Sequence, residues 1–291
     1  MPPKGLDSAR LIVPVGEANA ALARYDGLLQ SLVNPDILLA PLAGQEAVLS
    51  SRIEGTQATV EEVLEHEAGQ TYEADKEEDI REILNYGEAL SLGREAIREQ
   101  PVRLAMIREL HKRLMSSVRG EDKMPGEFRN VQNWIGKPGC TMEEASFVPP
   151  SPLQLRDHLQ DWEVYLEYRD TDPLIQCAVI HAQFELLHPF QDGNGRIGRL
   201  LIPLFLCQAN RLTEPMFYLS AYLERNRSEY YDRLQAISTE GAWVEWVVFF
   251  LQAITEQAQV NTDRVKRIHK LYEEMKTTVR KLTRSQHIIQ L

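Results

Sequence analysis

Apolar residues recur three and four positions apart along most of the chain, from about Ala18 onward, whereas alternating runs of strand type are scarce. This spacing places the apolar side chains on one face of a helix. Ala, Leu, Glu and Arg, which favour helices, dominate the same segments. The pattern predicts an all-α fold with two helical runs between residues 28 and 64. Further helices are expected at residues 80–98, 104–115, 153–166, 174–187, 195–208, 228–236 and 242–255.

The helical pattern is interrupted twice. Residues 67–79 are acidic and poor in apolar positions, which is typical of a connector between two units. Glycine and proline accumulate over residues 120–152, and a loop of this length inside a compact domain is usually functional. We expect a short β-hairpin at its end, over residues 140–148. The chain thus divides into an N-terminal helical region, a core and a helical tail, at residues 1–75, 76–260 and 261–291.

The tail has a charge and an apolar stripe of its own. Eight Lys and Arg stand against three Asp and Glu in residues 261–291, a net +5. One helix face carries apolar residues spaced three and four apart: Val265, Ile268, Tyr272, Met275, Val279 and Leu282. Such a stripe indicates a helix that packs on its own domain or, alternatively, supports a homodimer. The chain stops in an apolar run, residues 287–291, as a further helix would begin, which indicates a truncated sequence.

The net charge of −11 over 291 residues argues against a general polyanion binder, because neutralising phosphates requires an excess of Lys and Arg. The cysteines Cys140, Cys177 and Cys207 are too few and too widely spaced for a disulfide framework or a zinc site, so a reducing compartment fits. Apolar stretches fall far below the roughly 18 residues that span a membrane. We therefore expect a cytoplasmic protein without membrane contact.

Residues 188–199, HPFQDGNGRIGR, concentrate groups that phosphate chemistry needs. An apolar helix ends at the first of them, a tight turn follows, and another helix begins. Gly193 and Gly195 allow positive φ and close approach, so successive N–H groups can point at one anion at the helix N-terminus. Arg196 and Arg199 lie on one side of that helix and can bind phosphate oxygens.

Two further side chains complete this set. Asp192 precedes the turn and can hold Mg²⁺ against the same phosphates, since hard oxygen ligands suit that ion. His188 lies at the rim, where an imidazole can act as general base toward an incoming hydroxyl. A base, a metal ligand, an anion-binding turn and two arginines within twelve residues indicate a phosphoryl- or nucleotidyl-transfer site.

The same twelve residues are similar throughout to the signature of the Fic family, HPFxDGNGRxxR. The resemblance implies a helical bundle core with a small β-hairpin flap, and transfer of AMP from ATP to a Ser, Thr or Tyr hydroxyl of a target protein. It makes His188 the base, Asp192 the Mg²⁺ ligand and Phe190 the apolar anchor of the loop. The nucleotide-binding residues that it implies are Gly193, Asn194, Gly195, Arg196, Ile197, Gly198 and Arg199.

A second motif lies far upstream. Ser50, Glu54 and Gly55 resemble the inhibitory motif (S/T)xxxE(G/N) that many Fic proteins carry. In those relatives the glutamate pairs with the second arginine of the signature, here Arg199, and keeps the ATP γ-phosphate from its productive position. A carboxylate at this guanidinium removes a phosphate contact and adds repulsion. Relatives with the inhibitory helix on the N-terminal side often continue into a winged-helix module, so the resemblance also implies DNA as a partner through a missing C-terminal part.

Other segments also resemble the Fic core. Residues 125–136 are similar to the lead-in to the flap, which in the family holds the target as an added strand, here near Phe147 and Val148. Beyond the signature, the resemblance implies adenosine contacts from Asn226 and Tyr231. Packing between helices is the alternative for the tyrosine.

Three alternatives remain open from the sequence. His181, Glu185 and His188 follow one helix face at i, i+4 and i+7, as the ligands of a metal ion often do. The same fold could remove AMP or transfer another phosphate-containing group, because an anion-binding turn does not select the group that moves. The third alternative is a regulatory module that senses nucleotide without turnover.

Overall fold

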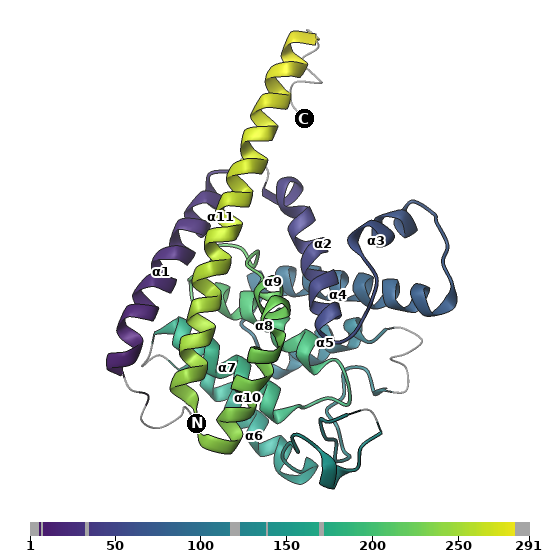
Figure 1. Ribbon diagram of the computed structural model, residues 1–291, viewed down its shortest axis with the longest axis vertical. Helices are drawn as coiled ribbons and strands as arrows, with labels where there is room; N and C mark the ends of the chain where they lie inside the picture. The colour runs from purple at the N-terminus through teal and green to yellow at the C-terminus, as the bar shows by residue number, and fades with distance from the viewer. Residues whose placement is uncertain are drawn as a thin grey trace.

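The computed structural model describes residues 6, 8–32, 35–116, 123–137, 139–168 and 172–282. These residues form eleven α-helices and no strand, which confirms the all-α fold class. The helices are α1 (Ser8–Gln30), α2 (Pro35–Ile53), α3 (Val60–Glu67), α4 (Ala74–Glu99), α5 (Leu104–Leu114), α6 (Pro152–Tyr165), α7 (Pro173–Leu187), α8 (Asn194–Gln208), α9 (Ser220–Arg225), α10 (Arg227–Glu240) and α11 (Trp243–Leu282). Figure 1 shows a helical body from which the end of α11 projects.

Helix α7 forms the centre of the core, because its sequence is apolar on all sides. Ten of its 15 residues are buried. The indole N–H groups of Trp162 and Trp246 donate to the carbonyls of Ile180 at 3.1 Å and Ala178 at 2.8 Å, which ties α6 and α11 to α7. Helix α8 is buried along nearly its whole length and packs on α7.

Helix α11 runs beside α1 for much of the molecule (Figure 1). The helix expected at residues 242–255 and the tail form one continuous helix of 40 residues, because neither Gly nor Pro interrupts them. Val265 is buried but Met275 is 59% exposed, so the apolar stripe packs on the body only at its start. Residues 287–291, where the sequence predicts a further helix, lie outside the described residues. No helix of the described ranges, α11 included, is both long and apolar enough to cross a membrane.

Helix α4 begins at Ala74, inside the acidic stretch that the sequence predicts as a connector. Asp75 and Glu77 lie in its first turn, where negative charge interacts favourably with the helix dipole. The connector between α3 and α4 is therefore only residues 68–73.

A buried carboxyl group fixes α2 in place. Glu46 accepts hydrogen bonds from Ser220 of α9 at 2.6 Å and from Tyr86 of α4 at 3.1 Å. Burial raises the pKa of Glu46 to about 7. These contacts bring the C-terminal end of α2 against α8.

The flap differs from the hairpin predicted over residues 140–148. A 3₁₀ turn, Met142–Glu144, occupies the middle of this segment and is capped by Thr141. Such local side-chain bonds compete with strand pairing. Within the described residues the flap is closed by a single antiparallel bridge, in which Ile135 and Phe147 exchange hydrogen bonds of 2.9 and 3.1 Å.

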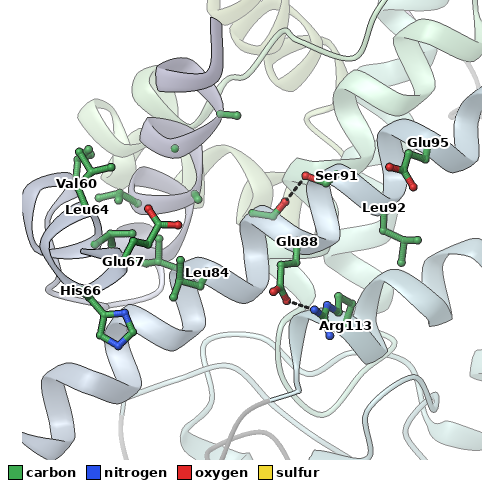
Figure 2. A pocket seen from close by; sticks show the side chains of 17 residues that line it. Val60, Leu64, His66, Glu67, Leu84, Glu88, Ser91, Leu92, Glu95 and Arg113 are labelled. Atoms are coloured by element: carbon green, nitrogen blue, oxygen red, sulfur yellow. Dashed lines mark hydrogen bonds and ion pairs between the residues drawn. The ribbon is translucent and has the colours of Figure 1, made fainter. Parts of the chain in front are cut away.

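A cavity of about 810 Å³ lies between α2, α3 and α4, away from the signature segment. Figure 2 shows Val60 and Leu64 of α3 on one side and Leu84 of α4 on the other. Glu88 of α4 pairs with Arg113 of α5 at its edge. Helix α3 is thus loosely packed, and none of its residues is fully buried.

Candidate active site

The signature segment begins where α7 ends. His188 takes a left-handed conformation, with φ 46° and ψ 60°, and its N–H donates to the carbonyl of Phe184 at 3.0 Å. Pro189 follows and cannot continue the helix. A left-handed conformation is uncommon outside glycine and is typical of functional positions. The turn leads the chain away from α7, so that α8 begins at Asn194.

Buried Arg129 holds this turn in place. Its Nε donates to the carbonyl of His188 at 2.9 Å and its Nη2 to that of Pro150 at 2.5 Å. Longer bonds of 3.3 and 3.4 Å reach the carbonyls of Leu187 and Val131. Burial lowers the pKa of Arg129. Arg129 therefore joins both ends of the flap to the turn at His188, a role that the sequence pattern does not reveal.

The loop between α7 and α8 closes on the side chain of Asn194. Its Oδ1 accepts from the N–H of Phe190 at 2.8 Å, and its Nδ2 donates to the Phe190 carbonyl at 2.9 Å. The buried ring of Phe190 stacks on His111, with centroids 3.7 Å apart. Because His111 Nδ1 accepts from the N–H of Gly126 at 2.9 Å, its Nε2 carries the proton and donates to the Asp192 carbonyl at 3.0 Å. Burial lowers the pKa of His111 to about 4, so this ring is neutral.

Two glycines bring the backbone close to the site. Gly193 has φ 75°, and a Cβ there would lie 3.0 Å from the sulfur of Met115. A Cβ on Gly195 would lie 2.2 Å from Oε1 of Glu54. The first N–H groups of α8 lack helical partners and, with the helix dipole, favour an anion. The Glu54 carboxylate therefore lies at the helix end that would receive a phosphate.

The guanidinium of Arg199 is buried and bonded to α2. Its Nη2 lies 2.6 Å from Oε1 of Glu54, so the predicted contact between these two residues is present. Ser50 accepts two more hydrogen bonds, through its hydroxyl from Nε at 2.8 Å and through its carbonyl from Nη2 at 2.9 Å. Gly55 follows with φ 111°, a conformation that favours glycine. Two of the three positions of the upstream motif, Ser50 and Glu54, thus bind the same arginine.

Arg196 pairs with a carboxylate that the sequence analysis did not identify. Its Nη1 lies 3.3 Å from Oε2 of Glu82 on α4, and its Nη2 lies 3.7 Å from Oδ1 of Asp192. Glu82 is 114 residues away in the sequence and belongs to no local motif. Both signature arginines are thus paired with glutamates that precede the signature, Glu54 near the end of α2 and Glu82 on α4.

The His188 imidazole is poised as a neutral base. Its Nδ1 is buried near the backbone of Glu185 and has no partner at ordinary hydrogen-bond geometry in the part of the chain that the structure describes, so Nε2 is the nitrogen left for a reactant. Burial lowers the pKa of His188 to about 4, although the charge of Glu54 opposes the shift. The ring is therefore unprotonated at neutral pH and can accept a proton.

Whether the site fits a phosphate group can be judged from arginine nitrogens that have no hydrogen-bond partner among the described residues. Nε of Arg196 and Nη1 of Arg199 are buried and have no hydrogen-bond partner among the described residues. Since buried polar groups are nearly always bonded, these donors fit an anionic ligand. The Asp192 side chain is 51% exposed and accepts the N–H of Gly193 at 2.6 Å. One half-exposed carboxylate beside phosphates fits Mg²⁺, which keeps several waters.

The predicted nucleoside contacts fall in different places. Tyr231 is 42% exposed and lines a cavity of about 290 Å³ together with Ile135 and Phe147 of the flap. Asn226 lies between α9 and α10, where its Nδ2 donates to the carbonyl of Tyr222 at 2.9 Å. It is not among the residues that line this cavity.

The structure does not support the alternative of a metal site at His181, Glu185 and His188. Both nitrogens of His181 are already bonded, Nδ1 with the carbonyl of Gly198 and Nε2 with the hydroxyl of Tyr230, each at 3.0 Å. Across the described ranges no group of three His, Cys, Asp or Glu side chains can hold a metal ion. His181 is instead a buried histidine that joins α7, α8 and α10.

Ile197 and Gly198 lie on the inner side of α8. Ile197 is fully buried in the core, and a Cβ on Gly198 would lie 2.2 Å from Oε1 of Glu185. Neither residue therefore offers a side chain to a phosphate. They allow α8 to pack closely on α7.

The fold and the site define an all-α protein that can bind phosphate groups beside a neutral histidine. Comparison of sequences identifies the family. Residues 12–95 match the N-terminal profile of the Fic/DOC family, and residues 101–206 match the Fic/DOC family profile itself. The chain belongs to the Fic/DOC family.

Relatives share the sequence in part and the fold more widely. The protein adenylyltransferase Fic of Aedes aegypti is 31% identical over 144 residues, which is 48% of this chain and 25% of that protein. The probable protein adenylyltransferase aq_aa38 of Aquifex aeolicus is 33% identical over 116 residues, 40% of this chain and 33% of that protein. The matches thus span a third or less of these relatives.

Solved structures of family members have the same fold. The crystal structure of a Fic family protein from Desulfovibrio desulfuricans superposes with a TM-score of 0.72 and 22% identity, covering 90% of this chain and 77% of that one. Fic-1 of C. elegans superposes with a TM-score of 0.66 and 18% identity, covering 91% and 74%.

Proposed function

We propose that the chain is a protein adenylyltransferase, which moves AMP from ATP to a Ser, Thr or Tyr hydroxyl of a target protein. The carrying observation is that a neutral His188, two buried arginines with unpartnered donors and the N-terminus of α8 meet at one place. The names of the relatives from Aedes aegypti and Aquifex aeolicus support the same activity.

The proposed reaction is a single displacement at phosphorus. Nε2 of His188 takes the proton of the target hydroxyl, and the hydroxyl oxygen forms a bond to the α-phosphorus of ATP. The bond between the α-phosphorus and the bridging oxygen breaks, and pyrophosphate leaves with the electron pair. Arg196, Arg199 and the N–H groups of residues 193–195 stabilise the negative charge that develops on the phosphate oxygens.

Asp192 would hold Mg²⁺ beside these phosphates. The ion, when bound, would neutralise part of the phosphate charge. Asp192 itself also orients the turn, because its side chain accepts the N–H of Gly193.

We include two further roles in the proposal. Glu54 occupies Arg199 and the end of α8, so it keeps the γ-phosphate out of its productive position and holds the protein in an inhibited state. The flap, closed by one bridge between Ile135 and Phe147, offers backbone groups to a target segment in extended conformation.

Labelling of proteins tests the activity directly. Protein carrying Glu54→Gly is incubated with a cell lysate and ATP labelled at either the α- or the γ-phosphate. Label from the α position alone is expected on proteins, and His188→Ala in the same background should abolish it. His158→Ala serves as the matched control, because His158 is exposed on α6. Label that comes only from the γ position would contradict AMP transfer.

A further inference from the structure

The cavity of about 810 Å³ between α2, α3 and α4 is an open apolar groove, which we call the α3 groove. Its apolar lining includes Val48 of α2, Val63 and Leu64 of α3, and Leu84 and Leu92 of α4. Leu64 is 59% exposed and Leu92 is 39% exposed, so the groove opens to solvent (Figure 2). Protein interiors are close-packed and exposed apolar patches mark contact surfaces, so this groove has the character of a docking site.

The shape of the α3 groove suits a helix. Small residues on two of its walls allow another backbone to approach closely: Ala43, Gly44 and Ala47 on α2, and Gly87 and Ser91 on α4. The lining residues of α4 run from Ile83 to Glu95, a rise of about 18 Å. This length matches about three turns of an amphipathic helix, which binds by laying its apolar face into such a groove.

The rim of the α3 groove is acidic. Glu67 of α3 and Glu95 of α4 are exposed there, whereas Glu88 is paired with Arg113. His66, the other basic side chain of the lining, is bonded to a further glutamate of α4. A helix that carries Lys and Arg beside its apolar face is therefore complementary to this rim in charge.

The projecting end of α11 has these properties. Residues 266–282 carry six Lys and Arg against two Glu. No side chain of residues 266–279 is buried, and Leu271 and Met275, one turn apart, are 56% and 59% exposed. The apolar stripe from Ile268 to Val279 rises about 17 Å, close to the length of the groove.

The tail of the same chain does not fill the groove. In Figure 1 the end of α11 leads away from the body and from α3. Since the matching helix and the matching groove lie apart on one molecule, they can meet only between two molecules.

We propose that the α3 groove binds the tail of a second copy of this chain, residues 266–282, as an amphipathic helix. Leu271 and Met275 contact the apolar lining, and the Lys and Arg side chains beside them face Glu67 and Glu95. When two copies exchange tails, both contacts form about one twofold axis, and the assembly closes as a dimer. The proposal does not rest on the proposed function, because neither contact involves the signature or the upstream motif.

The molecular mass of the whole chain in solution tests this interface. Light scattering at protein concentrations up to about 100 µM should show a dimer with a Kd in the micromolar range. Its mass should be twice the 33.3 kDa of one chain.

Two variants remove one side of the contact each. Leu92→Glu alters the groove and Met275→Glu alters the tail, and each should raise the Kd of the dimer about tenfold or more. Both replace exposed side chains, so the fold should remain, as circular dichroism can check. Leu153→Glu, at a 91% exposed side chain of α6, is the matched control and should keep the wild-type Kd.

Mixing the two variants separates tail exchange from other modes of association. Leu92→Glu protein keeps an intact tail, and Met275→Glu protein keeps an intact groove. A mixed pair therefore regains one of the two contacts, whereas a pair of identical variants has neither. The mixture should associate more tightly than either variant does alone.

Three results would overturn the proposal. A wild type that is still a monomer at about 100 µM would leave the groove to another protein or to a small apolar molecule. If Met275→Glu loses the dimer but Leu92→Glu keeps the wild-type Kd, the tails pair with each other instead. A mixture that associates no more tightly than the separate variants would exclude the exchange of tails.

Discussion

At the residue scale, the proposed inhibition means that the Glu54 carboxylate and an incoming phosphate compete for the guanidinium of Arg199. Because a hydrogen bond to a buried charged group contributes about 1.5–3 kcal/mol, Glu54→Gly should raise the initial rate of protein labelling by about tenfold or more. Glu67→Gly, at the exposed end of α3, is the control that should leave the rate unchanged. An equal or lower rate in Glu54→Gly would rule out an inhibitory role.

Arg129 provides a second prediction at this scale. Lysine cannot reproduce its several carbonyl contacts, so Arg129→Lys should let the His188 turn shift. Because small displacements of a catalytic base lower rates strongly, we expect a loss of roughly tenfold or more in labelling rate. The Kd of ADP should change little, since Arg129 touches neither signature arginine. Arg103→Lys, at an exposed ion pair with Glu167, controls for the substitution.

Whether the sequence predicts a residue of the site depends on how far along the chain its partners lie. The twelve residues from His188 to Arg199 form a local motif, and Glu54 belongs to another, so both could be predicted. Arg129 and Glu82 could not, because their partners lie 59 and 114 residues away and depend on how the helices pack. Sequence spacing carries no record of such contacts.

At the scale of the element, the position of α2 depends on whether Glu46 is protonated. Its pKa is raised to about 7 in the folded protein, so its contribution to stability is complete below its ordinary pKa and is lost as pH rises through 7. Between about pH 5 and 8 the loss is on the order of 3 kcal/mol. Glu46→Gln should flatten this dependence.

Thermal melting of both proteins across this pH range checks the prediction. The difference between wild type and Glu46→Gln isolates one group, because the raised pKa of Glu185 acts equally in both. Parallel curves would show that Glu46 does not titrate in the folded state.

The sequence predicts the bounds of a helix well where the residues of that helix determine its ends. It predicts the structure less well where other contacts determine it. Helices α7 and α8 begin and end within a residue of the expected bounds, because Pro173 begins α7, Pro189 follows its end and Gly193 caps the start of α8. The flap hairpin was not obtained, since Thr141 caps a tight turn instead. The tail continues α11 without a break, because neither Gly nor Pro interrupts residues 243–282.

At the scale of the whole molecule, three histidines with lowered pKa values contribute less to the stability of the fold in acid. Burial lowers the pKa values of His111, His181 and His188 to about 4, 3 and 4. Each ring stays neutral in the folded protein. Its contribution to the free energy of unfolding is therefore complete above about pH 6.5, and it falls at lower pH, where the unfolded chain takes up protons. The loss at about pH 5 is on the order of 2 kcal/mol for each ring.

Urea denaturation of wild type and His181→Gln between about pH 7 and 5 isolates one ring, because the raised pKa values of Glu46 and Glu185 stabilise both proteins as the pH falls. The variant replaces a ring bonded at both nitrogens, so it should be less stable at pH 7, and its difference from wild type should shrink by about 2 kcal/mol at pH 5. A difference that stays constant with pH would mean that this ring is protonated without loss of structure.

The bonds of Arg199 also set how fast the site can change. If Glu54 turns away, Ser50 still accepts two hydrogen bonds from the same guanidinium, and Glu46 still binds α4 and α9. Helix α2 can therefore stay docked while one half-exposed side chain moves. Exposed side chains change rotamer in picoseconds to nanoseconds, whereas local unfolding takes microseconds or longer. Access of a phosphate to Arg199 is thus limited by affinity and not by the speed of a helix movement.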